Sequence, residues 1–136
     1  MQVIDAHSAY QTSNTDTAGY LSARGVPFAG KQGFIYFQNL NTGKTHLVWE
    51  FAITHDGHAT KDLAANFQAN PTASEHKPYL AAAKNDAAYL RQKIQQTQPM
   101  QRLEADGQTH LAVKGTQRYK KLLSKHSHLI HPSHDA

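Results

Sequence analysis

The sequence contains no cysteine, so disulfides, thiolate nucleophiles and cysteine-ligated zinc sites are all excluded. It has no apolar run near the roughly 18 residues that a membrane span needs, and residues 1–10 lack the charged and apolar regions of a signal peptide. Glycine-rich nucleotide-binding loops and the Gly-x-Ser-x-Gly signature are also missing. We therefore expect a cytoplasmic protein that needs no membrane and no cofactor.

Charged residues make up only 18% of the 136 residues, but their signs are unevenly distributed. The formal net charge is +4; residues 1–60 carry three basic and four acidic side chains, whereas residues 110–136 carry five basic and one acidic. Such asymmetry favours a polyanionic partner, and nucleic acid, RNA in particular, is the usual one. The alternative is a solvated helix face with no partner.

Residues 33–54 predict a β-hairpin, because two β-branched and aromatic runs flank the short turn Asn41-Thr42-Gly43. If the turn has three residues, Phe37 pairs with Leu47. One face of the hairpin is then apolar and enters the core. The opposite face carries Phe34, Tyr36, Gln38, His46 and Glu50. A two-residue turn would exchange the faces of the first strand.

The rest of the chain predicts helices and a second hairpin. Apolar residues spaced three and four apart indicate a helix over 79–96, and Asp106-Gly107 predicts a tight turn between strands at 101–105 and 108–113. A second amphipathic helix is expected over 116–127, with Thr116 as its N-cap. Shorter helices are expected over 15–23 and 60–67.

These elements predict an α+β fold, in which an antiparallel sheet built from two β-hairpins carries two amphipathic helices. We expect a weakly structured prelude over residues 1–32, a single core domain over 33–126 and a histidine-rich, mobile tail over 127–136. The predicted core residues are Ile35, Phe37, Leu47, Trp49, Phe51, Leu80, Leu90, Ile94 and Leu122.

A near-repeat places a histidine at the same point of each hairpin. Gly-Lys-Thr-His-Leu-Val ends at Val48 and Gly-Gln-Thr-His-Leu-Ala ends at Ala112, so His46 and His110 both follow a turn. Two imidazoles can act as acid and base in metal-free cleavage of RNA, because their pKa lies near neutrality. Glu50 is the alternative base. Chance recurrence of Thr-His-Leu is the competing interpretation.

Two other histidine groups suggest metal ligands. His55 and His58, followed by Asp62, have donor types that zinc binds, but a polar turn that closes a strand is the favoured explanation, and no metal site is expected. The four histidines of the C-terminal segment, His126, His128, His131 and His134, resemble a flexible chelating tail.

Basic residues at Lys114, Arg118, Lys121 and Lys125 step by four, three and four, which predicts one basic stripe if the last helix reaches back to residue 114. Such a stripe can follow a phosphate backbone, and Tyr36 is the expected stacking residue.

These features are consistent with three alternative functions. The first is a small basic protein that acts on nucleic acid, as a metal-independent ribonuclease of the toxin type. The second is a non-catalytic inhibitor or accessory factor that docks on a protein or nucleoprotein complex. The third is a subunit of a larger assembly, which would associate through an exposed apolar patch around Phe34, Tyr36 and Val48.

Overall fold

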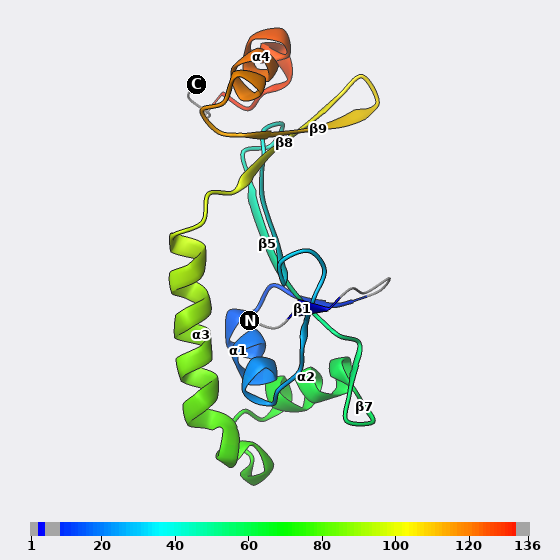
Figure 1. Cartoon of the computed structure of the whole chain (residues 1–136), viewed down its shortest axis with the longest axis vertical. Helices are drawn as coiled ribbons and strands as arrows, with labels where there is room; N and C mark the ends of the chain where they lie inside the picture. The colour runs from blue at the N-terminus through cyan, green and yellow to red at the C-terminus, as the bar shows by residue number, and fades with distance from the viewer. Residues whose placement is uncertain (1–2, 5–8, 133–136) are drawn as a thin grey trace. The chain divides into compact units, whose positions relative to one another are not determined.

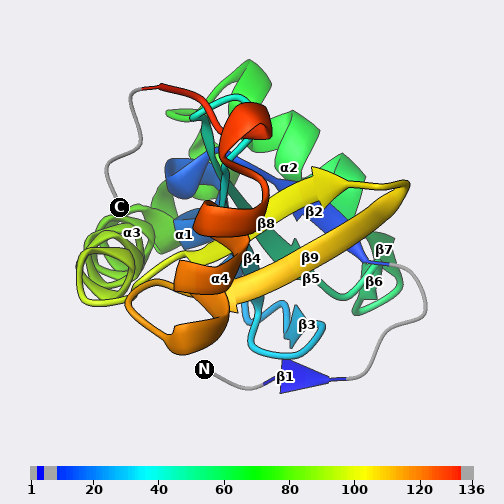
Figure 2. The ribbon, with the colours of Figure 1, turned by 90° about the horizontal axis from the view of Figure 1, so that it is seen from above.

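The computed structural model describes residues 3–4 and 9–132, with α-helices and strands labelled in Figure 1 and Figure 2. The strands are β1 (Val3–Ile4), β2 (Tyr10–Thr12), β3 (Phe28–Ala29), β4 (Phe34–Asn39), β5 (Thr45–Phe51), β6 (Thr54–His55), β7 (His58–Ala59), β8 (Met100–Ala105) and β9 (Gln108–Val113). The α-helices are α1 (Thr15–Ala23), α2 (Thr60–Ala69), α3 (Leu80–Gln95) and α4 (Gln117–Lys125), and short 3₁₀ helices cover Ser74–Tyr79 and Ser127–Leu129. No helix in this described part is long and apolar enough to cross a membrane.

The chain forms two compact units. Unit one consists of residues 1–35 and 48–96, and unit two consists of residues 36–47 and 97–136, so β4 and β5 pass from one unit into the other. The predicted boundaries at residues 32 and 126 both fall inside a unit. Within the expected prelude, residues 9–32 contain β2, α1 and β3, and the side chains of Tyr20 and Leu21 are completely buried.

The α+β class is confirmed, but the sheet is mixed rather than purely antiparallel. In unit one, β5 pairs antiparallel with β2 and β3, and β1 pairs parallel with β3. In unit two, β8 pairs antiparallel with β9 and parallel with β4. A tight turn forces its two strands to be antiparallel, whereas the long connection from β5 to β8 allows the parallel pairing with β4.

The register of the first hairpin differs from the prediction by one residue. The Asn39 amide donates to the Lys44 carbonyl at 2.8 Å, so the loop between the strands contains four residues instead of three. A shift of one residue turns every side chain of a strand to the other face. Phe34 is consequently 4% exposed and packs against Trp49, whereas Ile35 is 39% exposed.

The loop is longer because Asn39 and Leu40 have partners outside the strand pair. The Asn39 side chain accepts hydrogen bonds from the amides of Asn41 and Thr42, which closes the turn. Leu40 is completely buried, and its amide donates to the Arg102 carbonyl. The predicted apolar surface patch is therefore wrong at Phe34, which belongs to the core.

Helix α3 packs against α1, and the two helices lie side by side in Figure 1. The contact is close because Gly19 has no side chain: a Cβ there would lie 2.5 Å from the Ala83 carbonyl oxygen and 2.8 Å from the Ala87 Cβ. The sheet was expected to carry this helix on the face that bears its alanines Ala83 and Ala87. Their partner is α1 instead, because small residues on both helices let two backbones approach.

The core of unit one is largely aromatic. Tyr20 stacks on Phe67 with ring centroids 4.2 Å apart, and its hydroxyl lies 2.9 Å from Nδ1 of the buried His76. Among the predicted core residues, Trp49, Phe51 and Leu90 are buried, while Leu80 and Ile94 are half-buried. Tyr20 and Phe67 were missed because they belong to short helices with weak apolar periodicity.

Unit two has a separate core between its sheet and α4, and Figure 2 shows this helix in front of β8 and β9. The buried residues are Leu40, Leu103, Ala105, Ala112, Tyr119 and Leu122, with Leu123, Leu129 and Ile130 packed against them. Two local predictions are confirmed here. Asp106 and Gly107 have φ values of 54° and 71°, as a two-residue hairpin turn requires, and the Thr116 side chain accepts a hydrogen bond from the Tyr119 amide as N-cap of α4.

Candidate nucleic-acid interface

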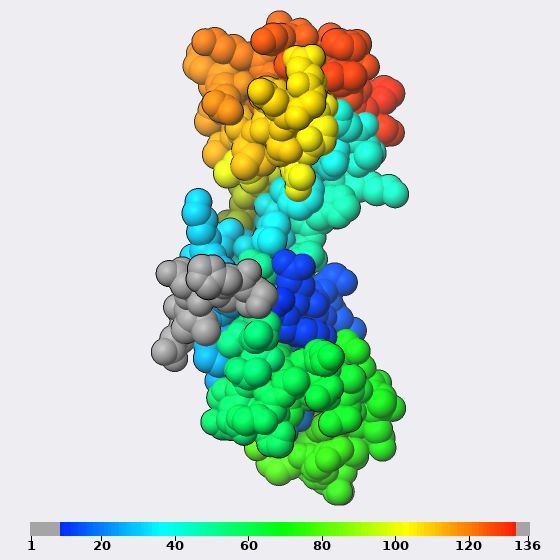
Figure 3. Space-filling view, turned by 90° about the vertical axis from the view of Figure 1, so that its right-hand side faces the viewer, coloured from blue at the N-terminus to red at the C-terminus, as the bar shows by residue number. Residues whose placement is uncertain are grey.

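Unit two carries the whole formal net charge of the protein. Unit one has seven basic and seven acidic side chains, whereas unit two has seven basic and three acidic, which accounts for the whole +4. Five of these seven cations lie between residues 114 and 125, all of them exposed, in and just before α4, which is drawn in orange in Figure 3. None of the five forms an ion pair within the described part of the chain.

The cations of α4 lie on two sides of the helix rather than in one stripe. At 3.6 residues per turn, Arg118, Lys121 and Lys125 share one flank. Lys114 does not join them, because α4 begins at Gln117 and Lys114 lies before the N-cap. Lys114 instead lines a hollow of about 670 Å³ together with Lys120 and the apolar surface of Tyr119 and Leu123.

Arg118 also connects α4 to the free edge of the sheet. Its Nε donates to the Leu111 carbonyl at 2.6 Å, and Thr116 donates from both its amide and its hydroxyl to the Val113 carbonyl. These bonds satisfy two outward-facing backbone carbonyl groups of β9. On an edge strand without such partners, these carbonyls would be free to pair with another chain. The Arg118 guanidinium is thereby held beside β9 with its charge exposed.

The structure does not bring His46 and His110 together. In unit two, His46 of β5 lies opposite Phe37 of β4. Phe37 pairs with Met100 of β8, and Met100 in turn pairs with Val113 of β9. Residues paired across strands share a face, and His110 is three positions from Val113, so it points to the opposite face. Three strand spacings of about 4.8 Å also separate β5 from β9. The two imidazoles therefore cannot reach one phosphodiester in this arrangement.

His110 has a different histidine as its neighbour. Its ring lies 5.6 Å from that of His126, which is 5% exposed at the end of α4. The His110 Nε2 atom is buried, without a hydrogen-bond partner among the described residues. His126 was expected in a chelating tail, but it belongs to the interior of unit two, and His134 lies outside the described residues. Spacing alone could not show this, because the contact joins a strand to a helix end.

Glu50 and Tyr36 do not lie beside His46 as the predicted catalytic and stacking roles would require. Glu50 lies in unit one, where Oε2 accepts a hydrogen bond from the Gln11 side chain at 3.1 Å. Tyr36 is half-buried and alternates with Phe37 along β4, so it points away from the face that carries His46.

The predicted metal candidates lie on a tight hairpin. His55 and His58 pair across β6 and β7, and the turn between them has φ values of 50° and 77° at Asp56 and Gly57. His55 contacts Asp56 at 3.3 Å, while Asp62 belongs to the first turn of α2. Among residues 3–4 and 9–132, no three histidine or carboxylate side chains gather closely enough to hold a metal ion.

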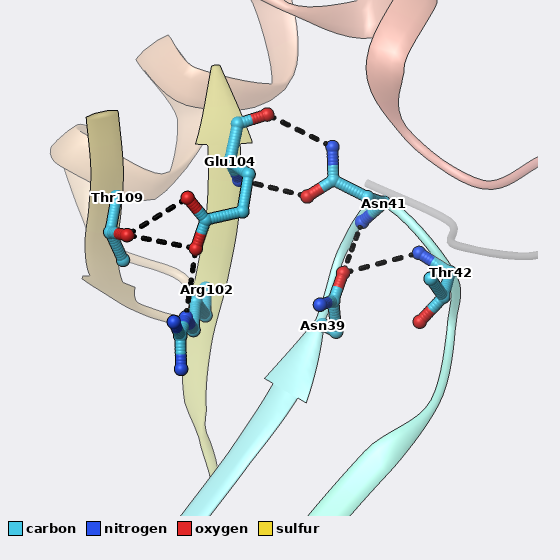
Figure 4. A network of polar contacts seen from close by, with 6 residues as sticks. All are labelled: Asn39, Asn41, Thr42, Arg102, Glu104 and Thr109. Atoms are coloured by element: carbon cyan, nitrogen blue, oxygen red, sulfur yellow. Dashed lines mark hydrogen bonds and ion pairs between the residues drawn. The ribbon is translucent and has the colours of Figure 1, made fainter. Parts of the chain in front are cut away.

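A polar network that the sequence did not suggest joins the first hairpin loop to β8 (Figure 4). The Asn41 side chain accepts from the Glu104 amide at 2.8 Å and donates to the Glu104 carbonyl at 3.0 Å, as a neighbouring strand would. The Glu104 carboxylate accepts from the Thr109 hydroxyl and from the Arg102 guanidinium. The sequence around Asn41 predicts a turn, but it contains no pattern that predicts the hydrogen bonds of this side chain to the Glu104 backbone.

We expect the stability of the protein to depend on the ionisation of Glu104. Hydrogen bonds from Thr109 and then from Arg102 hold the pKa of Glu104 below its ordinary value of 4.5. A lowered folded-state pKa means that the stabilisation is present above pH 4.5 and is lost as the pH falls through the folded value. Glu104→Gln should therefore lower the free energy of unfolding near neutral pH but not in acid, as measured by urea denaturation. An equal loss at both pH values would contradict this origin.

Comparisons with protein-family models, curated proteins and solved structures gave no match.

Proposed function

We propose that unit two binds nucleic acid, with RNA as the first ligand to test, and that it does so without cleaving it. The observation that supports binding is the separation of charge, because unit one is formally neutral and unit two carries +4. Exposed cations on both flanks of α4 can contact successive phosphates, and each contact releases counterions from the strand.

Binding through α4 does not require the histidines to act chemically. A ribonuclease that uses His46 and His110 would need both imidazoles on one side of the sheet, within hydrogen-bond reach of the same phosphodiester. Their opposite faces argue against that reaction, so we propose binding without cleavage. The basic residues predicted for phosphate contact, Lys114, Arg118, Lys121 and Lys125, are all exposed.

The test is fluorescence anisotropy of the full chain with labelled RNA and duplex DNA, in EDTA, at several salt concentrations. We expect binding whose logarithm falls linearly with the logarithm of salt, with a slope of about −3 for some four phosphate contacts on a single strand. Gels run on the same samples should show intact RNA. Absence of binding at low salt would overturn the proposal and favour a protein partner, and cleavage that His46→Ala abolishes would restore the ribonuclease hypothesis.

A further inference from the structure

The sheet of unit two has a second face, which points away from α4. Side chains alternate along each strand, so the residues next to the buried Leu103 and Ala112 point the other way. Met100, Leu111 and Val113 share this second face and are 38%, 47% and 46% exposed. Large apolar side chains that gather on one exposed face are typical of a binding surface.

Three stacked side chains stand on the same face. The His46 ring lies over Phe37 with centroids 4.8 Å apart and planes inclined by 23°. The Arg102 guanidinium lies 4.9 Å from the centroid of the same Phe37 ring. His46 itself is exposed, so it presents a flat ring to a ligand. We call His46, Phe37 and Arg102 the ring stack. Another planar group could stack on its exposed His46 ring.

The charges near the ring stack suit an anionic ligand. Lys44 is paired with Asn39 on this face, and the Arg118 guanidinium is fixed at the neighbouring edge of β9. Glu104 is the acidic residue on the face, and its carboxylate is already occupied by Arg102 and Thr109. A planar ligand that also carries phosphates would match both the rings and the cations.

We infer that this face binds unpaired bases, so that the nucleic-acid ligand of unit two is single-stranded; this inference rests on the proposed function. Bases in a duplex are stacked on one another and present only their edges, whereas the bases of a single strand can stack on protein rings. Stacking on His46 would be sequence-tolerant, because every base has a planar face. Arg118, which is held at the edge of β9, and the exposed Lys44 would hold the backbone.

The experiment compares the wild type with a Phe37→Leu, His46→Ala double variant of the full chain. Leucine keeps an apolar side chain at position 37, so the variant removes the rings with little loss of packing; circular dichroism and thermal unfolding verify its fold. The probes are a labelled single-stranded uridine oligonucleotide and a duplex of equal length. We expect a loss of single-strand affinity of at least about tenfold, the usual effect of removing base stacking, with an unchanged salt slope and unchanged duplex affinity.

The matched control is Tyr89→Ala, which removes an exposed aromatic ring from unit one. Its single-strand affinity should equal that of the wild type. If the double variant binds the oligonucleotide as tightly as the wild type does, or if the wild type prefers the duplex, the inference is overturned while nucleic-acid binding stands. If neither probe binds wild-type protein at low salt, the proposed function fails together with the inference.

Discussion

Reversing two charges on α4, in a Lys121→Glu, Lys125→Glu variant, should weaken RNA binding on the order of 100-fold at moderate salt. Both side chains are exposed on the flank that also carries Arg118, and both can contact phosphates. On a single strand, each lost phosphate contact should reduce the steepness of the salt dependence by about 0.7. Anisotropy titrations across a salt series measure both quantities, and the slope should therefore become less steep by about 1.5.

The matched control for this variant reverses Lys61 and Lys84, which are exposed on α2 and α3 of unit one. Both double variants lower the formal net charge from +4 to zero. If long-range attraction alone governed binding, the two would lose affinity equally, and the assignment to α4 would be wrong. We expect the unit-one variant to lose far less, since the Debye length is about 10 Å at 0.1 M salt.

Gly19→Ala should destabilise the protein by about 2 kcal/mol, although alanine is the better helix former. Helix propensity alone would favour alanine by about 1 kcal/mol. At position 19, however, the new methyl group would lie 2.5 Å from the Ala83 carbonyl oxygen and 2.8 Å from the Ala87 Cβ. α1 and α3 would have to separate, and overpacking of this kind costs about 1–3 kcal/mol.

Chemical denaturation measures this change, with Ser22→Ala as the control on the same helix. Ser22 is half-buried on α1, so its replacement tests helix propensity without a methyl group directed at Ala83. We expect the control to be neutral or slightly stabilising. A Gly19→Ala protein as stable as the wild type would show that α1 does not pack on α3 through this glycine.

The spacing of His46 and His110 in the sequence did not predict their positions in the sheet. The turn at Asp106-Gly107 was predicted correctly, so the position of His110 on its strand was known. The first hairpin differs by one residue, and β8 pairs parallel with β4, which together place His46 and His110 on opposite faces. Neither fact is local, because each depends on the partners that Leu40 and β8 find elsewhere in the chain.

The sequence by itself determined the features that a few neighbouring residues control: the Asp-Gly turn, the Thr116 cap, the helix over residues 80–95, the α+β class and the basic C-terminal segment. Their free energies come from backbone dihedral preferences, local hydrogen bonds and apolar spacing within one element. Only the tertiary structure decided the strand register, the contact of α1 with α3, the burial of His126 and the exposure of the ring stack. Those features depend on which apolar surfaces, distant in the sequence, are buried against one another. The hydrophobic effect is non-directional, so the pattern within one element does not identify its partner.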